Sequence, residues 1–256
     1  MEMIKLERTG DYATITLARP AKRNSINNQM LAEFEEALTA VESDKAVRAL
    51  CLAGEGRHFC AGIDLAEGHR VAATDGGKGL SLETVFHHLE GLAIPTVAAV
   101  QGAALAGGCE LALHCDMRIA SENARLGMPL ARIGLTPPFN FTRKLIEIIG
   151  APYTCQLLFT ADAIDGRRAY EIGMVNEVVP DGDLEPAVKA LMDKVAANAP
   201  LSLRAMKATI RRCMSTAYDA THDDIDQLIA SVVKSEDNRE GSRAFLEKRA
   251  PKFIGK

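Results

Sequence analysis

Apolar and polar positions alternate from Met3 to Arg19, and the alternation breaks at Thr9-Gly10-Asp11. A period of two is typical of a strand with one buried face, and a glycine in the break permits a tight turn. The pattern therefore predicts a β-hairpin at the start of the chain.

The apolar spacing changes to that of a helix after residue 28. The apolar residues of this segment recur at intervals of three and four and form one stripe, which consists of Met30, Leu31, Phe34, Leu38 and Val41. Asn27 or Asn28 can cap this helix, because an asparagine side chain can accept a hydrogen bond from a free amide of the first turn.

Short apolar runs and helical segments then alternate as far as residue 182. Strands are predicted at 48–54, 96–100, 117–120 and 174–179, and a helix at about 81–93. Short apolar strands that alternate with helices indicate parallel pairing and an α/β core. From residue 183 onward all segments have helical spacing, so we expect a core over 1–182 and a helical region over 183–256.

The segment 67–83 has weak patterning and contains the motif Gly-Gly-Lys-Gly. The spacing of a phosphate-binding loop is absent, and no apolar strand precedes the motif. A dinucleotide-binding glycine motif after a strand is absent as well. We interpret this segment as a mobile surface loop.

Composition and charge narrow the functional classes. The 256 residues are 47% hydrophobic and 25% charged, with a net charge of −4 and dispersed basic residues. This argues against nucleic acid and membrane surfaces as main partners. No apolar signal core and no membrane-length apolar run are seen, so we expect a soluble, cytoplasmic protein. The six cysteines form no CxxC pair, which predicts buried, reduced thiols and no metal site.

Two stretches, 50–65 and 97–113, share one order of features. Each has an apolar strand, a loop with a glycine, an Ala-Gly pair and then an acid, Asp64 or Glu110, at the expected start of an apolar helix. Free N–H groups and the positive end of the helix dipole lie at such a start. Two such turns that face each other can hold one developing oxyanion. The alternative is that small residues simply permit close packing of helix on strand.

Five stretches carry a resemblance to the crotonase (enoyl-CoA hydratase/isomerase) superfamily over nearly the whole chain. They are RPAKRNSIN (19–27), VRALCLAGEGRHFCAGIDL (47–65), PTVAAVQGAALAGGCELALHCDMRIAS (95–121), IGMVNEVVP (172–180) and AFLEKRAPKF (244–253). The resemblance implies an α/β crotonase (ClpP-like) spiral of ββα units. It also implies that the helical region 183–256 serves trimerisation and pocket closure, in a homotrimer or a dimer of trimers.

The resemblance further implies an acyl-CoA substrate, with coenzyme A present only as part of the thioester and no separate cofactor. Backbone N–H groups of Ile63 and Gly107 would hold the thioester oxygen, and Glu110 would be catalytic. The residues implied in CoA binding are Ala61, Asp64 and Leu65, with Arg23 near the nucleotide end, and Phe245 and Lys248 from a neighbouring subunit. Phe245 and Lys248 fit a core aromatic and a solvated lysine equally well.

The sequence departs from the family pattern where a second catalytic glutamate is expected, because that position is Leu130. Pro138 occupies a position where other members carry an acid. We therefore expect Glu110 to be the single acid/base, which favours isomerase-like proton transfer through an enolate. An enoyl-CoA hydratase despite Leu130, and a catalytically silent acyl-CoA-binding protein, are the alternatives.

Two histidines have simple interpretations. His114 follows Glu110 by one helical turn, where it can either hydrogen-bond the glutamate or merely pack against it. His58 is interpreted as an exposed loop residue.

Overall fold

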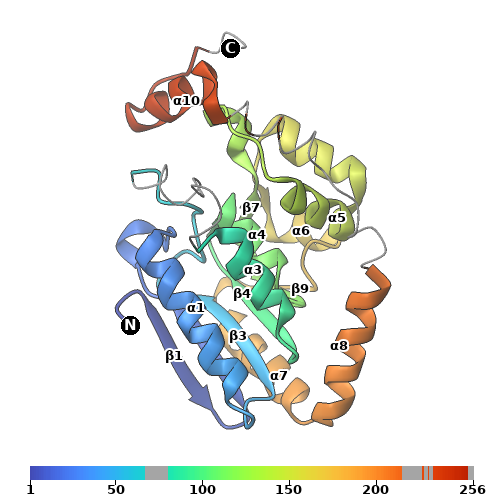
Figure 1. Ribbon diagram of the computed structural model, residues 1–256. Coiled ribbons are helices and arrows are strands. Elements are labelled where there is room, and N and C mark those ends of the chain that lie inside the picture. Colours follow the sequence, from blue (N-terminus) through green and yellow to red (C-terminus); the bar gives the residue numbers. More distant parts are fainter. Residues whose placement is uncertain (67–79, 215–226, 228–229, 231–232, 253–256) are drawn as a thin grey trace.

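The computed structural model describes residues 1–66, 80–214, 227, 230 and 233–252 (Figure 1). Its centre is a six-stranded sheet with the order β1-β2-β3-β4-β6-β9, in which β1 and β2 are antiparallel and all other neighbours are parallel. The strands are β1 (Ile4–Thr9), β2 (Tyr12–Leu17), β3 (Ala49–Gly54), β4 (Thr96–Val100), β6 (Met117–Ser121) and β9 (Glu177–Val179).

Helices cover both faces of this sheet (Figure 1). The first face packs against α1 (Asn28–Ser43), α3 (Leu82–Gly91) and α4 (Gly107–Leu113), whose buried side chains join the main hydrophobic cluster. The second face packs against α7 (Leu184–Ala196), where Val188 and Met192 lie in one cluster with Val97 and Ile119. The first helix of the expected helical region, α7, therefore packs directly on the sheet and belongs to the core.

A second, three-stranded sheet lies beside the first and positions α4. It has the order β5-β7-β8 and consists of β5 (Ala103–Leu105), β7 (Arg125–Gly127) and β8 (Ile164–Asp165). Strand β5 leads directly into α4, and β7 leads into the 3-10 turn η2 (Pro129–Ile133). These strands have only two or three residues, too few to give a periodic signal in the sequence.

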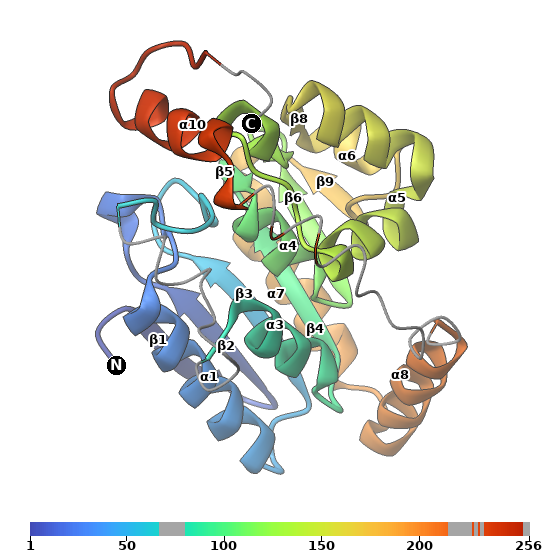
Figure 2. The same cartoon turned by 45° about the horizontal axis from the view of Figure 1, so that its top comes forward.

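The remaining elements surround this framework. They are the 3-10 turns η1 (Pro20–Lys22) and η3 (Asp181–Asp183) and the helices α5 (Phe139–Thr160), α6 (Gly166–Glu171), α8 (Pro200–Met214) and α10 (Glu236–Leu246). In both views α8 and α10 lie at opposite ends of the molecule (Figure 2). The buried Lys207 fixes α8 to the core, because its Nζ donates to the Ile94 carbonyl at 2.9 Å and pairs with Asp116 at 2.7 Å.

Most elements expected from the sequence are confirmed. The hairpin turns at residues 10 and 11, and Asn27 is the cap of α1, with its Oδ1 accepting from the Met30 N–H at 2.9 Å. The strand expected at 174–179 is wrong in its first half, since β9 begins at Glu177. Met174 donates instead to Ala169 at the end of α6, and its carbonyl accepts from Arg118 Nε at 2.7 Å, so its backbone is used outside a ladder.

Three expectations fall wholly or partly outside the described residues. Residues 67–79 of the expected loop are outside, whereas 82 and 83 already belong to α3. Residues 215–226, 228–229, 231–232 and 253–256 of the helical region expected over 183–256 are outside as well. The helix expected to start at Asp64 is absent through Ala66, where the chain forms a turn, and its continuation is not described. Of the described helices, none has the length and apolar character needed to cross a membrane.

Candidate active site

The segment 60–64 lies between two other segments and bonds to both. On one side, Ile26 N–H donates to the Gly62 carbonyl at 2.8 Å and Asp64 N–H donates to the Ile26 carbonyl at 2.9 Å. This is an isolated parallel bridge between Ile26 and Ile63. The pattern leaves the Ile63 N–H itself without an acceptor among the described residues.

On the other side, the same segment bonds to the start of the second sheet. Cys60 N–H donates to the Ala103 carbonyl at 2.9 Å, and Leu105 N–H donates to the Cys60 carbonyl at 3.0 Å. Residues 50–65 and 97–113, which share one order of features in the sequence, therefore meet in the folded chain.

The two stretches also lie against each other at Gly62 and Gly107. A Cβ placed on Gly107 would lie 3.7 Å from the Gly62 Cα and 3.8 Å from the Ile63 nitrogen. Gly62 has a φ of +94°, which residues with a Cβ rarely adopt. Gly107 is the first residue of α4, so its N–H has no partner within the helix. The structure thus brings the two predicted amides together, while their role with a substrate stays a prediction.

Ala106, immediately before α4, has an unusual backbone conformation. Its φ of 49° and ψ of −120° are disfavoured for any residue with a Cβ. Its N–H donates to the Gly127 carbonyl at 2.9 Å, which holds it against β7. Strained residues of this kind cluster at functional sites, and here the strain sets the direction of the adjacent Gly107 amide.

Glu110 lies on α4, three residues after Gly107, and its side chain is fully buried. Neither carboxylate oxygen has a hydrogen-bond partner in the described part of the chain. Burial raises the pKa of this carboxyl well above its ordinary value, and the nearby Lys144 charge only partly opposes the rise. A buried acid without partners is costly to keep, which favours a functional role.

An aromatic cluster encloses the side of α4 that follows Glu110. The His114 ring lies 5.4 Å from the Phe86 ring and 5.6 Å from the Phe141 ring, measured between centroids. Burial lowers the pKa of His114 to about 4. His114 therefore both packs against its neighbours and hydrogen-bonds Glu110, through the backbone carbonyl of that residue.

A buried ion pair lies beside this cluster and was not predicted from the sequence. Lys144 Nζ on α5 lies 2.6 Å from Glu90 Oε1 on α3 and 3.4 Å from Glu147 Oε2. Burial alone would raise the pKa of Glu90, but the opposing contributions, led by the Lys144 charge and its hydrogen bond, lower that pKa overall. Only the packing of α3 on α5 brings these residues together, so the sequence offered no signal for the pair.

Leu130 and Pro138 occupy the stretch between β7 and α5. Leu130 belongs to η2 and is half-buried against the main hydrophobic cluster, as is Ile63. Pro138 is the N-cap residue of α5. Both positions are apolar, so neither supplies a second acid or base.

Four of the residues expected to bind coenzyme A lie in the segment 60–65 or bond to it. Ala61 and Arg23 lie together, because the Ala61 N–H donates to the Arg23 carbonyl at 3.0 Å. Arg23 is exposed, and Leu65 is half-buried in the turn after Ile63. The Asp64 carboxylate is already engaged, since its Oδ2 lies 3.1 Å from Arg19 Nη2.

Phe245 and Lys248 lie at the end of α10, which packs on η2. Asn238 of α10 is buried, and Gly241 meets the backbone of Ile133 so closely that a Cβ there would clash. Phe245 is 58% exposed, so the interpretation of this residue as a core aromatic is wrong for this chain. Lys248 is exposed.

The expectation of buried, reduced cysteines is confirmed for four of the six, and the expectation for His58 is not. Cys51, Cys60, Cys109 and Cys115 are buried and free, whereas Cys155 and Cys213 are free but exposed, contrary to the expectation. His58 is half-buried and its Nδ1 accepts from the Ala103 N–H at 3.1 Å, so its interpretation as an exposed residue is wrong. Among the described residues, no group of three or more His, Cys, Asp or Glu is placed to hold a metal ion.

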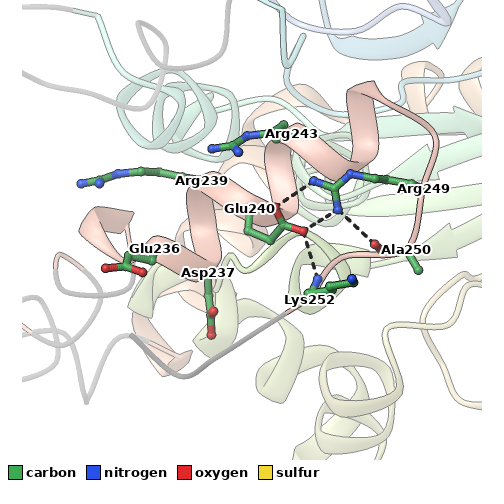
Figure 3. A pocket seen from close by; sticks show the side chains of 8 residues that line it. All are labelled: Glu236, Asp237, Arg239, Glu240, Arg243, Arg249, Ala250 and Lys252. Carbon is green, nitrogen blue, oxygen red and sulfur yellow. Dashed lines mark hydrogen bonds and ion pairs between the residues drawn. The ribbon is translucent and has the colours of Figure 1, made fainter.

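A polar pocket on α10 is distinct from the Glu110 site (Figure 3). Glu240 spans it with two contacts to Arg249 and a further one from the Lys252 N–H. One alanine and side chains of both charge signs line the pocket: Glu236, Asp237, Arg239, Glu240, Arg243, Arg249, Ala250 and Lys252. None of the predicted site residues contributes to it.

Comparisons with known proteins agree with this architecture. The family described as enoyl-CoA hydratase/isomerase matches residues 7–256. The chain is 38% identical to the crotonyl-CoA hydratase of Syntrophomonas wolfei, with 100% of this chain and 99% of that protein covered. It is 37% identical to the short-chain-enoyl-CoA hydratase of Clostridium acetobutylicum, with 95% and 94% covered. The solved enoyl-CoA hydratase/isomerase of Pseudoalteromonas atlantica superposes with a TM-score of 0.88 at 27% identity, covering 98% and 100%.

Proposed function

The chain belongs to the enoyl-CoA hydratase/isomerase family, the crotonase superfamily, and we propose that it transfers a proton on an acyl-CoA thioester through an enolate. Glu110 is the single acid/base of this proposal. The observation that carries it is the fully buried Glu110 carboxylate, which has no hydrogen-bond partner among the described residues and lies on the helix whose first residue, Gly107, lies against Gly62 and Ile63.

The proposed reaction uses the two amides and the carboxylate in sequence. The thioester oxygen accepts from the Ile63 and Gly107 N–H groups. Ionised Glu110 removes a proton from the carbon next to the carbonyl or at the far end of the conjugated system. The electron pair of that C–H bond moves into the enolate, and protonated Glu110 returns the proton to the other carbon. A carboxyl with a raised pKa suits both steps, because it is a stronger base and still a usable acid.

The proposed substrate contacts follow the residues implied by the family. Backbone groups of Ala61, Asp64 and Leu65 lie along the CoA chain, and the exposed Arg23 guanidinium binds its nucleotide end. The exposed Arg23 side chain and the Ala61–Arg23 hydrogen bond support this placement. Coenzyme A enters and leaves as part of the substrate, and no separate cofactor is used.

We further propose a homotrimer, or a dimer of trimers, in which Phe245 and Lys248 contribute to a neighbouring subunit's CoA site. Large apolar side chains on α8 support an interface, since Leu201, Met206 and Ile210 are all exposed by 60% or more. We place the enzyme in the cytoplasm, which the free thiols of all six cysteines support. A monomeric mass in sedimentation at micromolar concentration would overturn the oligomer.

Hydration is the second candidate, because the two relatives described above are named hydratases. Adding water also needs a group that holds and deprotonates the water at the β-carbon. The half-buried Leu130 cannot do this. Loss of a general acid or base typically costs about 10²–10⁴-fold in rate. Hydration by this chain is therefore expected to be slow relative to proton transfer.

The test is Glu110→Gln, which keeps the shape of the side chain and removes the base. We expect it to abolish deuterium exchange from solvent into bound acyl-CoA, with thioester affinity within a few-fold of wild type. The exposed Glu122→Gln is the matched control and should change neither. A panel of 2-enoyl- and 3-enoyl-CoA esters, with hydrated and isomerised products resolved, separates the two candidates. Full exchange by Glu110→Gln would sink the proposal, and absence of exchange by wild type would favour a silent acyl-CoA-binding protein.

A further inference from the structure

Arg19 connects the two segments that meet at the Ile63 turn. Its Nη1 donates to the Ser25 carbonyl at 2.6 Å, and its Nη2 lies 3.1 Å from Asp64 Oδ2. Ser25 and Asp64 flank the isolated bridge between Ile26 and Ile63. One guanidinium therefore holds both sides of the turn that carries the Ile63 amide.

The segment that holds Arg19 is itself fixed. Arg19 lies two residues after the end of β2, and its backbone N–H donates to Asn24 Oδ1 at 2.9 Å. The fully buried Asn24 donates in turn to the carbonyls of Glu55 and His58, at 3.0 and 2.7 Å. The guanidinium thus projects from a rigid base, which is what an orienting group needs.

The Asp64 carboxylate is used entirely within the protein. Its Oδ2 takes the Arg19 contact, and its Oδ1 accepts from the Ala66 N–H at 3.2 Å. The side chains of Arg19 and Asp64 are only 13% and 11% exposed. A charge pair this shielded from water holds its geometry better than a surface pair.

From these contacts we propose that Arg19 is a positioning residue for the oxyanion site. By clamping Ser25 to Asp64 it keeps the Ile63 N–H directed toward the space beside Gly107. This inference rests on the proposed function, because the amide has this role only if the site holds a thioester oxygen. It assigns the Asp64 side chain to the turn rather than to coenzyme A, and leaves only the Asp64 backbone for the substrate.

The geometry also explains why arginine serves here. Two acceptors from segments that are far apart in the chain need two N–H groups held in one plane, which a guanidinium supplies and an ammonium does not. A misplacement of about 1 Å at a reacting group can cost about 10²-fold in rate. Loosening the turn should therefore lower turnover more than it lowers affinity.

The experiment compares the variants Arg19→Ala, Arg19→Lys and Asp64→Asn with a matched control, Arg167→Ala. The control removes the exposed ion pair between Arg167 and Glu122. The direct readout is the infrared carbonyl stretch of bound butyryl-CoA labelled with ¹³C at the thioester carbon, which reports polarisation by the two amides. We expect Arg19→Ala to lose most of the shift that wild type induces and to lower kcat about 10- to 100-fold, with KM within about 3-fold. Arg19→Lys should retain part of the carbonyl shift and part of kcat. Asp64→Asn should give values of both quantities between those of wild type and Arg19→Ala.

Hydrogen exchange separates the clamp from the proposed function. Arg19→Ala should speed exchange of the bonded Ile26 and Asp64 amides in the free protein, whatever the activity, while Arg167→Ala should not. Wild type without turnover or carbonyl shift would defeat the proposed function, and the exchange data would still decide on the clamp. If Arg19→Ala fails to fold, Asp64→Asn carries the same comparison. An unchanged carbonyl shift, kcat and exchange in a folded variant would overturn the inference.

Discussion

The Nδ1 atom of His114 lies 2.7 Å from the backbone carbonyl oxygen of Glu110 and 3.9 Å from Oε2 of the Glu110 carboxylate. A carbonyl oxygen can only accept, so Nδ1 carries the hydrogen and the tautomer of the neutral ring is fixed. The short contact goes to the backbone, which leaves the carboxylate without a full hydrogen bond. Burial favours the neutral form of both groups. It therefore raises the pKa of Glu110 and lowers that of His114 to about 4.

The first prediction concerns the pH dependence of activity. The proposed base is ionised Glu110, so kcat/KM should fall as the pH decreases through its raised pKa, at a pH above the ordinary carboxyl range. The Lys144 charge lowers this pKa, and Lys144→Met should therefore move the acid limb to higher pH. Lys189→Met, which removes an exposed lysine, should leave the profile in place. An acid limb that does not move in Lys144→Met would refute the link between Lys144 and the base.

The second prediction concerns stability. Below the ordinary carboxyl pKa, Glu110 is protonated in both the folded and the unfolded chain. As the pH rises, the unfolded chain releases this proton first, so wild type loses stability until the folded pKa is passed. Each pKa unit of difference corresponds to about 1.4 kcal/mol. Glu110→Gln should therefore gain unfolding free energy relative to wild type as the pH rises from 4 to 8, measured by urea denaturation.

Glu90→Gln is the control for that measurement, because the pKa of Glu90 is shifted in the opposite direction to that of Glu110. Lys144 lowers the folded pKa of Glu90, so this carboxylate stabilises the fold above its ordinary pKa and loses that effect as the pH falls. The deficit of Glu90→Gln should accordingly be largest near neutral pH and shrink in acid. Parallel pH dependences for the two variants would contradict both assignments.

The third prediction uses two adjacent glycines of α4. A methyl group on Gly107 would meet only ordinary contacts of 3.7 and 3.8 Å, at Gly62 and Ile63. Gly107→Ala should fold with a melting temperature near that of wild type, yet lose activity because the methyl group fills the space between the two amides. Removal of one oxyanion donor typically costs about 10²–10³-fold in kcat, and an effect of that order is expected.

Gly108→Ala should fail for a different reason. A Cβ on Gly108 would lie 2.1 Å from the Cys60 carbonyl oxygen, which is backbone and cannot move aside cheaply. This variant should lose several degrees of melting temperature together with its activity. Full activity in Gly107→Ala would show that the space between Gly62 and Gly107 does not receive the substrate.

The fourth prediction concerns the missing second carboxylate. Leu130 is half-buried at η2, and Leu130→Glu would supply a group able to hold and deprotonate water. Hydration of a short 2-enoyl-CoA should rise, by up to the roughly 10²–10⁴-fold that a general base contributes. The measurement is the ratio of hydrated to isomerised product. Leu130→Gln, which is polar but not basic, should leave that ratio close to that of wild type. Efficient hydration by wild type would show that Leu130 is no obstacle.

The sequence alone determined the features that depend on near neighbours. Alternation from residues 3 to 19 specified the hairpin, and the apolar stripe after Asn27 specified α1 together with its cap. Such patterns are local, because a strand or helix buries one face with a fixed period. The Ala-Gly turns and Glu110 were visible for the same reason, as short motifs with their own conformational meaning.

The tertiary structure decided which of these local features meet. Arg19 and Asp64 are 45 residues apart and Lys144 and Glu90 are 54 apart, and no periodic signal connects residues at such separations. The very short β5 and β7 were invisible in the sequence, yet they set the position of α4 and of Gly107. Likewise, the helical pattern of α7 did not reveal that it covers the second face of the sheet. Contacts between distant segments follow from the packing of whole elements, and that packing alone places Gly62 against Gly107.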